Sequence, residues 1–470
     1  MKIVNRIFFG ALAIVVLGSS VIQAQSAATS LPAGKVIEKV TCTKSPTQFY
    51  AVYLPSTYSS AHAWPVMYAF DPGARGPLPV DRFREAAEKF GWIIVGSNNS
   101  QNGLMQQSLD AWIAMWDDTH ARFAIDAQRV YASGFSGGAR VAIYFARLCK
   151  DCIAGVIACG AGFPQGIQPS SDLHFKIFGV AGVDDFNFSE LRDLDASLTH
   201  AGVGHVIDSF DGRHDWPPAS EATVAIAWME LEAMKAGKRP RDQKLIAELW
   251  QTQMERANSF SVAKNVLDQY RTSAAMVESF NGLAETQTLE TLRSEVAKLA
   301  TTRHLKDALR EERKQLERQQ ELTQQLTQLL AQPGNAEVEQ ENQLRSLLSS
   351  LRDDSKAAND SSSRRVARRV LEGMMIGLFE RGVDQLQRQK HYADAIRSFA
   401  TATQINPDRP GAFYYLASAY ALNGDKKKAL QALQTAIQKG FADREAIVTN
   451  AAFESLRNDP AYVEMIQELM

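Results

Sequence analysis

The sequence predicts an α/β domain with a mainly parallel sheet, followed by an all-α region that ends in helical repeats. Three observations support this prediction. Short β-branched runs alternate with helical segments over residues 35–236, residues 241–370 contain almost no strand pattern, and the last hundred residues repeat with a period of 34. Strands that alternate with helices indicate a parallel sheet covered on both faces.

The first domain is expected to contain seven strands with helices between several of them. The strands are expected at Gln48–Leu54, Pro65–Phe70, Trp92–Ser97, Arg129–Ser133, Ile153–Cys159, Phe175–Val180 and His205–Phe210. Helical periodicity is present in Asp81–Phe90, Ser108–Phe123 and Gly138–Leu148. A last helix should follow Pro217-Pro218 and end near Gly237, where a glycine and then Pro240 stop it.

Residues 241–370 are expected to form helices that connect the two ends of the chain. Leucines suggest an apolar seam at positions 305, 309, 316, 326 and 330, but Glu312, Gln319 and Thr323 stand where a heptad needs apolar residues. Packed or extended helices are therefore favoured over a sustained coiled coil. Breaks are expected at Pro333-Gly334-Asn335 and at Asp353–Ser363.

A basic run, Arg364 to Arg369, lies at the end of this region. Such a run fits either an anionic partner or a solvated helix face, and the solvated face is the more common case.

The C-terminal segment 374–470 contains two related copies of a helical pattern. Three apolar positions recur at the same spacing, Ala395, Phe399 and Ala402 in one copy and Ala429, Leu433 and Ala436 in the other. This pattern resembles the tetratricopeptide repeat, in which small residues allow helices to pack closely. The resemblance implies a protein partner for this segment.

The first 26 residues are interpreted as a signal peptide. Lys2 and Arg6 precede the apolar run Ile7–Leu17, and small residues follow at Ala24–Ala27. A membrane anchor is the alternative, but the run is shorter than the roughly 18 apolar residues that a span needs. The mature protein is therefore expected to be exported, either to the periplasm or outside the cell, with no stable membrane span. A net charge of −2 gives no reason to expect nucleic acid.

Four cysteines are present, at positions 42, 149, 152 and 159. An oxidising compartment would permit up to two disulfides, and Cys149 and Cys152 are close in sequence. A structural bridge or buried thiols are favoured over redox chemistry, because no thioredoxin-like pattern surrounds the pair. No second paired-cysteine motif completes a zinc site, and no metal or cofactor is expected.

The segment Gly134-Phe135-Ser136-Gly137-Gly138 raises the question of a nucleophilic serine. It lies between an expected strand and an expected helix, where two glycines permit a tight turn that presents the Ser136 hydroxyl at the carboxyl edge of the sheet. An ordinary glycine-rich turn is the alternative. The surrounding strand and helix favour the nucleophile.

A serine nucleophile needs a histidine base and an acid. His214 alone among the eight histidines follows a strand directly, after Ser136, within the same domain. A surface loop histidine is the alternative interpretation. The acid is expected after the strand that ends near Val180, where Asp184 and Asp185 are both suitably placed. The serine, aspartate and histidine then follow one another in the order of this kind of hydrolase.

These motifs, GFSGG, GVDDFNF and GRHDWPP, resemble the α/β-hydrolase superfamily over residues 35–236, especially compact esterases related to feruloyl esterases and polyhydroxyalkanoate depolymerases. The resemblance implies Asp185 as the acid, with Asp184 as the alternative. It also implies an oxyanion site made by the Gly137 amide and a second amide from the loop FDPGARG. Gly73 is the first choice for that donor and Ala74 the second, because Pro72 has no N–H.

The resemblance implies an exported serine carboxylesterase that acts on a small or polymer-borne ester. The polar loop after Trp92–Gly96 and Trp216 are expected to border the site, which should lack a large inserted lid. A catalytically silent hydrolase-fold binding or assembly protein of the cell envelope is the alternative, and a serine peptidase is less favoured. Every candidate catalytic residue precedes Gly237, and tetratricopeptide units bury their apolar faces mainly against neighbouring repeats, so the helical tail need not pack on the active site.

Overall fold

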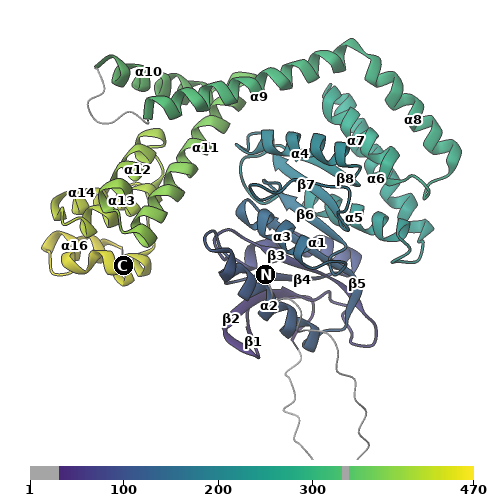
Figure 1. Ribbon diagram of the computed structural model, residues 1–470, viewed down its shortest axis with the longest axis horizontal. Helices are drawn as coiled ribbons and strands as arrows, with labels where there is room; N and C mark the ends of the chain where they lie inside the picture. Colours follow the sequence, from purple (N-terminus) through teal and green to yellow (C-terminus); the bar gives the residue numbers. More distant parts are fainter. Residues whose placement is uncertain (1–30, 331–337, 470) are drawn as a thin grey trace, which may run out of the picture. The chain divides into compact units, whose positions relative to one another are not determined.

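The computed structural model describes residues 31–330 and 338–469 (Figure 1). The predicted signal peptide and the break expected at residues 333–335 lie outside the described residues. Over the described part, the fold class is the predicted one. A mainly parallel sheet flanked by helices is followed by an all-helical region.

The sheet has eight strands in the order β1-β2-β4-β3-β5-β6-β7-β8. The first two pairings, β1 with β2 and β2 with β4, are antiparallel, and all of the others are parallel. The strands are β1 Val36–Cys42, β2 Ser45–Tyr53, β3 Trp64–Phe70, β4 Ile93–Ser97, β5 Ile125–Phe135, β6 Gly155–Cys159, β7 Lys176–Gly182 and β8 His205–Phe210. Seven of them were predicted, and β1 was missed.

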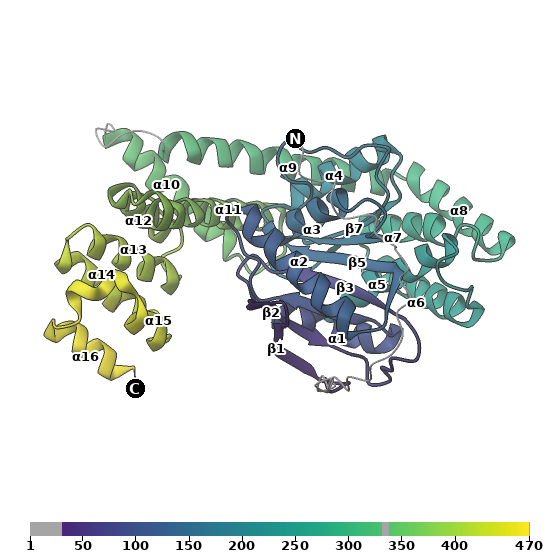
Figure 2. The ribbon, with the colours of Figure 1, turned by 60° about the horizontal axis from the view of Figure 1, so that its bottom comes forward.

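Five helices cover the two faces of the sheet, as Figure 2 shows. They are α1 Pro77–Phe90, α2 Met105–Arg122, α3 Gly137–Leu148, α4 Phe188–Ala201 and α5 Ala219–Lys235. Helices α1 and α5 pack together on one face. Helix α2 contacts α3. Helix α3 is joined to α4 by an ion pair between Arg140 and Glu190 at 2.7 Å. Apolar side chains of α1, α5 and the strands between them form one buried core that includes Trp92 and Trp216.

The carboxyl ends of six parallel strands, β4, β3, β5, β6, β7 and β8, meet at one edge of the sheet. The register pairs Phe70 with Gly134, Phe135 with Cys159, and Gly182 with Phe210. Loops that follow β3, β5, β7 and β8 therefore begin side by side, although they are far apart in sequence. In a sheet of this kind, that edge is where catalytic and binding groups gather.

Helices continue to the end of the chain. They are α6 Gln243–Val262, α7 Val266–Ser279, α8 Thr286–Thr301, α9 Arg303–Leu330, α10 Val338–Ser355, α11 Ser362–Asp384, the π-helical turn η1 Gln385–Gln389, α12 Tyr392–Ile405, α13 Pro410–Leu422, α14 Lys426–Gln438, α15 Arg444–Thr449, the 3₁₀ helix η2 Ala451–Leu456 and α16 Pro460–Glu468.

The connecting helices pack against the sheet domain and against one another. Apolar residues of α5 share a buried cluster with α6, α7 and α8, and Leu322 and Leu326 of α9 pack with α10 and α11. The predicted leucine seam is not continuous, because Leu305 and Leu326 are buried while Leu309 is 39% exposed. Packed helices form here, as the broken heptad pattern predicted.

The repeat positions identified in the sequence form the core of the last helices. Ala395, Phe399 and Ala402 on α12 and their counterparts on α14 are fully buried. The preceding helix α11 joins this core, since Gly382 lies so close to the Phe399 ring that an added Cβ would be 2.7 Å from it. Phe379 of α11 also packs there.

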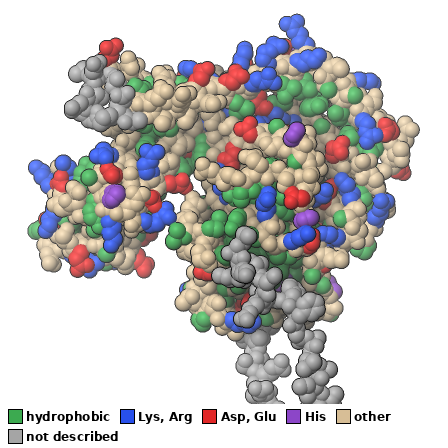
Figure 3. Space-filling view, in the orientation of Figure 1, with side chains coloured by type: hydrophobic (Ala, Val, Ile, Leu, Met, Phe, Trp, Pro, Cys, Tyr) green, Lys and Arg blue, Asp and Glu red, His purple; other side chains and the backbone are tan. Residues whose placement is uncertain are grey.

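The surface carries both charges. Figure 3 shows acidic and basic side chains interspersed over the visible face. In the part of the chain that the structure describes, no helix combines the length and the apolar character that a membrane crossing requires.

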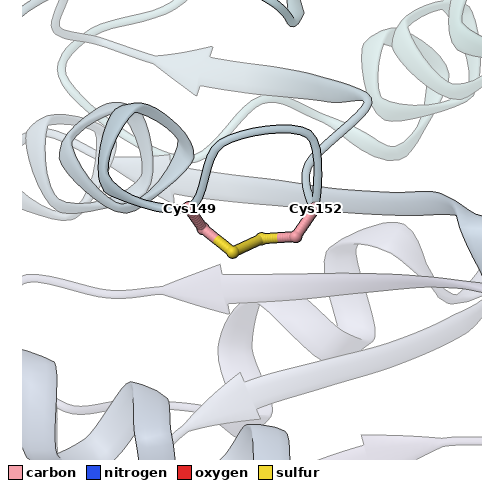
Figure 4. Close-up of a disulfide and its surroundings, with 2 residues drawn as sticks. All are labelled: Cys149 and Cys152. Atoms are coloured by element: carbon pink, nitrogen blue, oxygen red, sulfur yellow. A yellow bond between two sulfur atoms is a disulfide. The ribbon is translucent and has the colours of Figure 1, made fainter. Parts of the chain in front are cut away.

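The cysteines divide into one bridge and two buried thiols. A disulfide joins Cys149 at the end of α3 to Cys152 in the turn before β6 (Figure 4). Cys42 and Cys159 are free and buried. Burial raises the pKa of both thiols, that of Cys42 to about 12.

The disulfide and the two buried thiols predict that the cysteines become reactive in steps. The native, oxidised protein should show no rapidly reacting thiol, because the two free thiols are buried and protonated at neutral pH. Two thiols should react after denaturation and four after denaturation with reduction. Measurement with a chromogenic disulfide reagent checks this, and four reactive thiols without reductant would contradict the bridge.

Candidate active site

Ser136 occupies the sharp turn between β5 and α3. Its backbone has φ 53° and ψ −121°, a conformation that costs energy in a residue other than glycine. The flanking glycines make the turn possible, because a Cβ on Gly134 would overlap the carbonyl group of Gly138 and one on Gly138 would overlap that of Phe70. The backbone amide of Ser136 donates to the carbonyl of Cys159 at 2.8 Å, which fixes the turn to β6.

The Gly137 amide lies at the first position of α3. Such an amide has no acceptor within its own helix, so it is suited to bind a developing negative charge. The carboxamide of Asn102, in the loop after β4, lies against the Cα of Gly137, and an added Cβ would overlap its oxygen. The loop that was expected to border the site therefore reaches the serine turn.

His214 and Asp185 form a buried polar contact at this edge. His214 Nδ1 lies 2.8 Å from Asp185 Oδ1, and the side chains are 6% and 0% exposed. The backbone amide of Asn187 donates to the same carboxylate oxygen at 2.7 Å, which orients the carboxylate. The imidazole lies between two aromatic rings, with centroids 4.4 Å from Phe135 and 4.2 Å from Phe186.

The neighbouring Asp184 faces a different partner. Its Oδ2 accepts a hydrogen bond from Arg368 Nη1 at 2.6 Å, in an ion pair whose carboxylate is 4% exposed. Its backbone amide donates to the carbonyl of Gly212. Of the two candidate acids, the structure therefore brings Asp185 to His214 and Asp184 to the basic run.

The loops that carry the serine and the histidine follow β5 and β8 at the same edge of the sheet. The Phe135 ring beside the imidazole belongs to the residue that precedes Ser136. Among the described residues, no hydrogen bond joins the Ser136 hydroxyl to His214.

The loop after β3 is organised by Asp71, which is fully buried. Asp71 Oδ1 accepts from the Gly73 amide at 2.8 Å, its two oxygens bind Arg75, and Oδ2 accepts from Trp216 Nε1 at 2.8 Å. The Ala74 amide donates to the Asp71 carbonyl at 3.2 Å. Both amides expected as second oxyanion donors are therefore engaged within the loop.

Trp216 is 1% exposed and holds the histidine loop in place rather than bordering the site.

The helical tail contacts the loop that carries the two candidate acids. Arg369 Nε donates to the carbonyl of Val183 at 2.7 Å, and Gln319 Nε2 of α9 donates to that of Phe186 at 2.8 Å. Val183 directly precedes and Phe186 directly follows the pair Asp184-Asp185 in the sequence. Arg369 is 1% exposed, its guanidinium lies over the Phe188 ring at 4.3 Å, and burial lowers its pKa to about 10. The basic run is thus neither a solvent-exposed helix face nor a free binding site for an anionic partner. Arg364 and Arg365, in the same run, also bind Asp360.

Sequence reasoning missed several residues that shape the site, Asp71, Asn102, Arg368, Arg369 and Glu372. Asp71 and Asn102 had local signals, because an aspartate directly after a buried strand lies at the carboxyl edge and Asn102 belongs to the polar loop that was expected to border the site. The three residues on α11 lie more than 150 positions after the residues that they approach, and no local pattern marks such contacts.

Comparisons with known proteins agree with this architecture. Residues 386–447 match the tetratricopeptide repeat family. A search of curated proteins found no match. Over its first domain the chain is similar to solved esterase structures. One is an S-formylglutathione hydrolase from Staphylococcus aureus, 16% identical, covering 43% of this chain and 98% of that one with a TM-score of 0.35.

Two further similar structures are named for ferulic acid esters. A ferulic acid esterase is 18% identical, covering 42% of this chain and 97% of its own, with a TM-score of 0.35. The feruloyl esterase module from Clostridium thermocellum, in complex with sinapinate, is 15% identical, covering 45% and 94%, with a TM-score of 0.31. At these identities and TM-scores, the likenesses show neither a reaction nor a substrate for this chain.

The contact between Arg368 and Asp184 predicts a loss of stability when it is broken. Arg368→Leu should lower the free energy of unfolding by about 2–4 kcal/mol, because it leaves a buried carboxylate without a counter-ion. Arg365→Leu is the matched control in the same run. Its partner Asp360 is 51% exposed, so the loss should be about 1 kcal/mol or less. Denaturant unfolding of both variants measures the difference, and equal losses would contradict the contact.

Proposed function

We propose that the protein is an exported serine carboxylesterase whose catalytic residues are Ser136, His214 and Asp185. One observation carries the proposal. A buried aspartate–histidine pair, 2.8 Å apart, lies at the edge of the sheet where Ser136 stands in a strained strand-to-helix turn. A base held by an acid beside an exposed hydroxyl is the arrangement that nucleophilic acyl transfer requires.

In the proposed reaction, His214 Nε2 removes the proton from Ser136 Oγ while the oxygen attacks the ester carbonyl. Asp185 keeps the proton of His214 on Nδ1 and stabilises the imidazolium that forms. The imidazolium then protonates the departing alcohol, which leaves an acyl group on Ser136. A water molecule, activated by the same imidazole, attacks this acyl-enzyme and releases the acid.

The negative charge on the substrate oxygen needs at least two donors in such reactions. The Gly137 amide is the first donor that we propose. Gly73 remains the proposed second donor, and its amide would have to exchange its bond to Asp71 for one to the substrate. Because Asp71 also binds Trp216, that exchange would be linked to the loop that carries His214.

We also propose that the C-terminal repeats bind a protein partner, since helical repeats of this kind commonly present a surface for other proteins. Export is supported by the basic, apolar and small-residue order of the first residues. It is further supported by the Cys149–Cys152 disulfide, because such bonds persist in oxidising compartments.

One observation favours the alternative of a silent binding protein. In the described part of the chain, the hydrogen bonds of His214 reach Asp185 but not Ser136. A hydrolase fold that no longer uses its serine would retain the acid–base pair as a structural contact. Covalent labelling of Ser136 separates the two functions.

Ser136→Ala should abolish labelling by a fluorophosphonate probe and reduce hydrolysis of 4-nitrophenyl butyrate by several orders of magnitude, because the nucleophile is lost. The exposed Ser171→Ala variant is the control and should retain both. Gel fluorescence and kcat/KM check the prediction. Turnover of Ser136→Ala close to that of the wild type, or a wild type that never labels, would reject the esterase assignment.

The two aspartates should differ in their effect on turnover. Asp185→Asn should reduce kcat far more than Asp184→Asn, because only Asp185 holds His214 in the correct tautomer. A loss of about 10³- to 10⁴-fold is expected for Asp185→Asn. Steady-state kinetics on one short ester measures both variants, and the reverse ranking would assign the acid to Asp184.

A further inference from the structure

Helix α11 contacts the candidate active site at two places along one face. A helix turns once in 3.6 residues, so positions 369, 372, 373, 376 and 380 share a side. Near one end, Arg369 binds the Val183 carbonyl and Gly373 lies against Phe186, where an added Cβ would be 3.0 Å from the Phe186 Cβ. The Phe186 ring is the one that contacts His214.

At the other end, Glu380 Oε1 accepts a hydrogen bond from Asn102 Nδ2 at 2.8 Å. Asn102 is also the residue whose carboxamide lies against Gly137. From Glu372 to Glu380 is about 12 Å along a helix. The same face of α11 thus extends from the loop that carries the acid to the turn that carries the serine.

Glu372 lies on this face next to Gly373, which packs against Phe186, the residue whose ring contacts the proposed base His214. Its Oε2 is fully buried and has no hydrogen-bond partner among the described residues. The charges that act on its carboxyl most strongly are His214, then Arg213, Asp185 and Arg409. None of the ion pairs formed by the described residues includes Glu372. Burial raises the pKa of this carboxyl, while the charge of Arg213 and a proton on His214 lower it.

A buried carboxylate oxygen without a donor is unfavourable unless water, a proton or a ligand satisfies it. The fold leaves this oxygen without an arginine partner, on the face of α11 that contacts the histidine loop. A ligand group that both carries a positive charge and donates a hydrogen bond would satisfy it best. A protonated primary amine does both, whereas a quaternary ammonium group has no hydrogen to donate.

We infer that Glu372 is a specificity-determining residue that binds a protonated amino group of the substrate, so that amine-bearing esters are preferred to neutral ones of the same shape. This inference rests on the proposed esterase function. It makes the all-helical region part of the substrate-binding site, because α11 lies outside the sheet domain. Glu372 itself takes no part in the transfer of the acyl group.

The test compares esters that differ only in an amino group. One pair carries it on the acyl side, 4-nitrophenyl 6-aminohexanoate against 4-nitrophenyl hexanoate. The other carries it on the alcohol side, 4-(aminomethyl)phenyl hexanoate against 4-methylphenyl hexanoate. For each pair the measured quantity is the ratio of the two kcat/KM values, at neutral pH, in the full-length protein.

The wild type should prefer the amine in at least one pair. Glu372→Gln should reduce that ratio by about 10- to 100-fold, mainly through KM of the amino ester, as expected for the loss of a charged hydrogen bond. Glu372→Met, which removes the polar group entirely, should do the same and provides a second variant. Glu321→Gln on α9, whose side chain is 66% exposed, is the matched control and should leave the ratio unchanged.

Ratios near one in both pairs for the wild type would overturn the inference while leaving the esterase proposal intact, provided that Ser136 is required for hydrolysis. A loss in Glu372→Gln that is equal for both members of a pair would also overturn it, because that result indicates a structural effect on His214. If the wild type hydrolyses none of the four esters and Ser136 never labels, the proposed function fails, and this inference fails with it.

Discussion

The loop that follows β7 is the constraint on which the rest of the site depends. Two adjacent aspartates leave it in different directions, Asp185 toward His214 and Asp184 toward Arg368. Because the carbonyls of Val183 and Phe186 on either side accept from Arg369 and Gln319, the loop is held by the sheet domain and by two helices of the tail. The position of the acid is thus set by residues that take no part in the chemistry.

Much of the sheet domain could be predicted because its signals are local. Buried parallel strands are continuous apolar runs, and their order along the chain fixes which loops reach the carboxyl edge. The same reasoning selected Ser136, His214 and two aspartates without any coordinates. Strand β1 was missed because it is an antiparallel strand at the sheet edge, paired only with β2, and several of its side chains are exposed. Its pattern lacks the apolar run that marks the central strands.

The remaining features could not be predicted because they depend on partners chosen across the chain. A run of arginines has the same sequence pattern whether it faces water or binds a buried carbonyl, so the roles of Arg368 and Arg369 were not visible. That the Asp71 carboxylate and carbonyl engage the amides of both Gly73 and Ala74 depends on how this loop folds, which no local pattern shows. Trp216 followed His214 closely enough to suggest a place at the site, yet its indole N–H is bound to buried Asp71.

Helix α11 has two faces that pack against different parts of the structure, the loop after β7 and the core of the repeats. Residues 368–373 contact the loop after β7, and Gly382 packs against Phe399 in the core of the repeats. Each residue advances a helix by 100°, so one residue inserted between Gly373 and Gly382 would rotate these two sets of contacts out of phase. The number of residues between Gly373 and Gly382 therefore cannot change without breaking one of the two sets of contacts. During evolution, repeats could be added or lost after α12, whereas insertions within α11 would be eliminated.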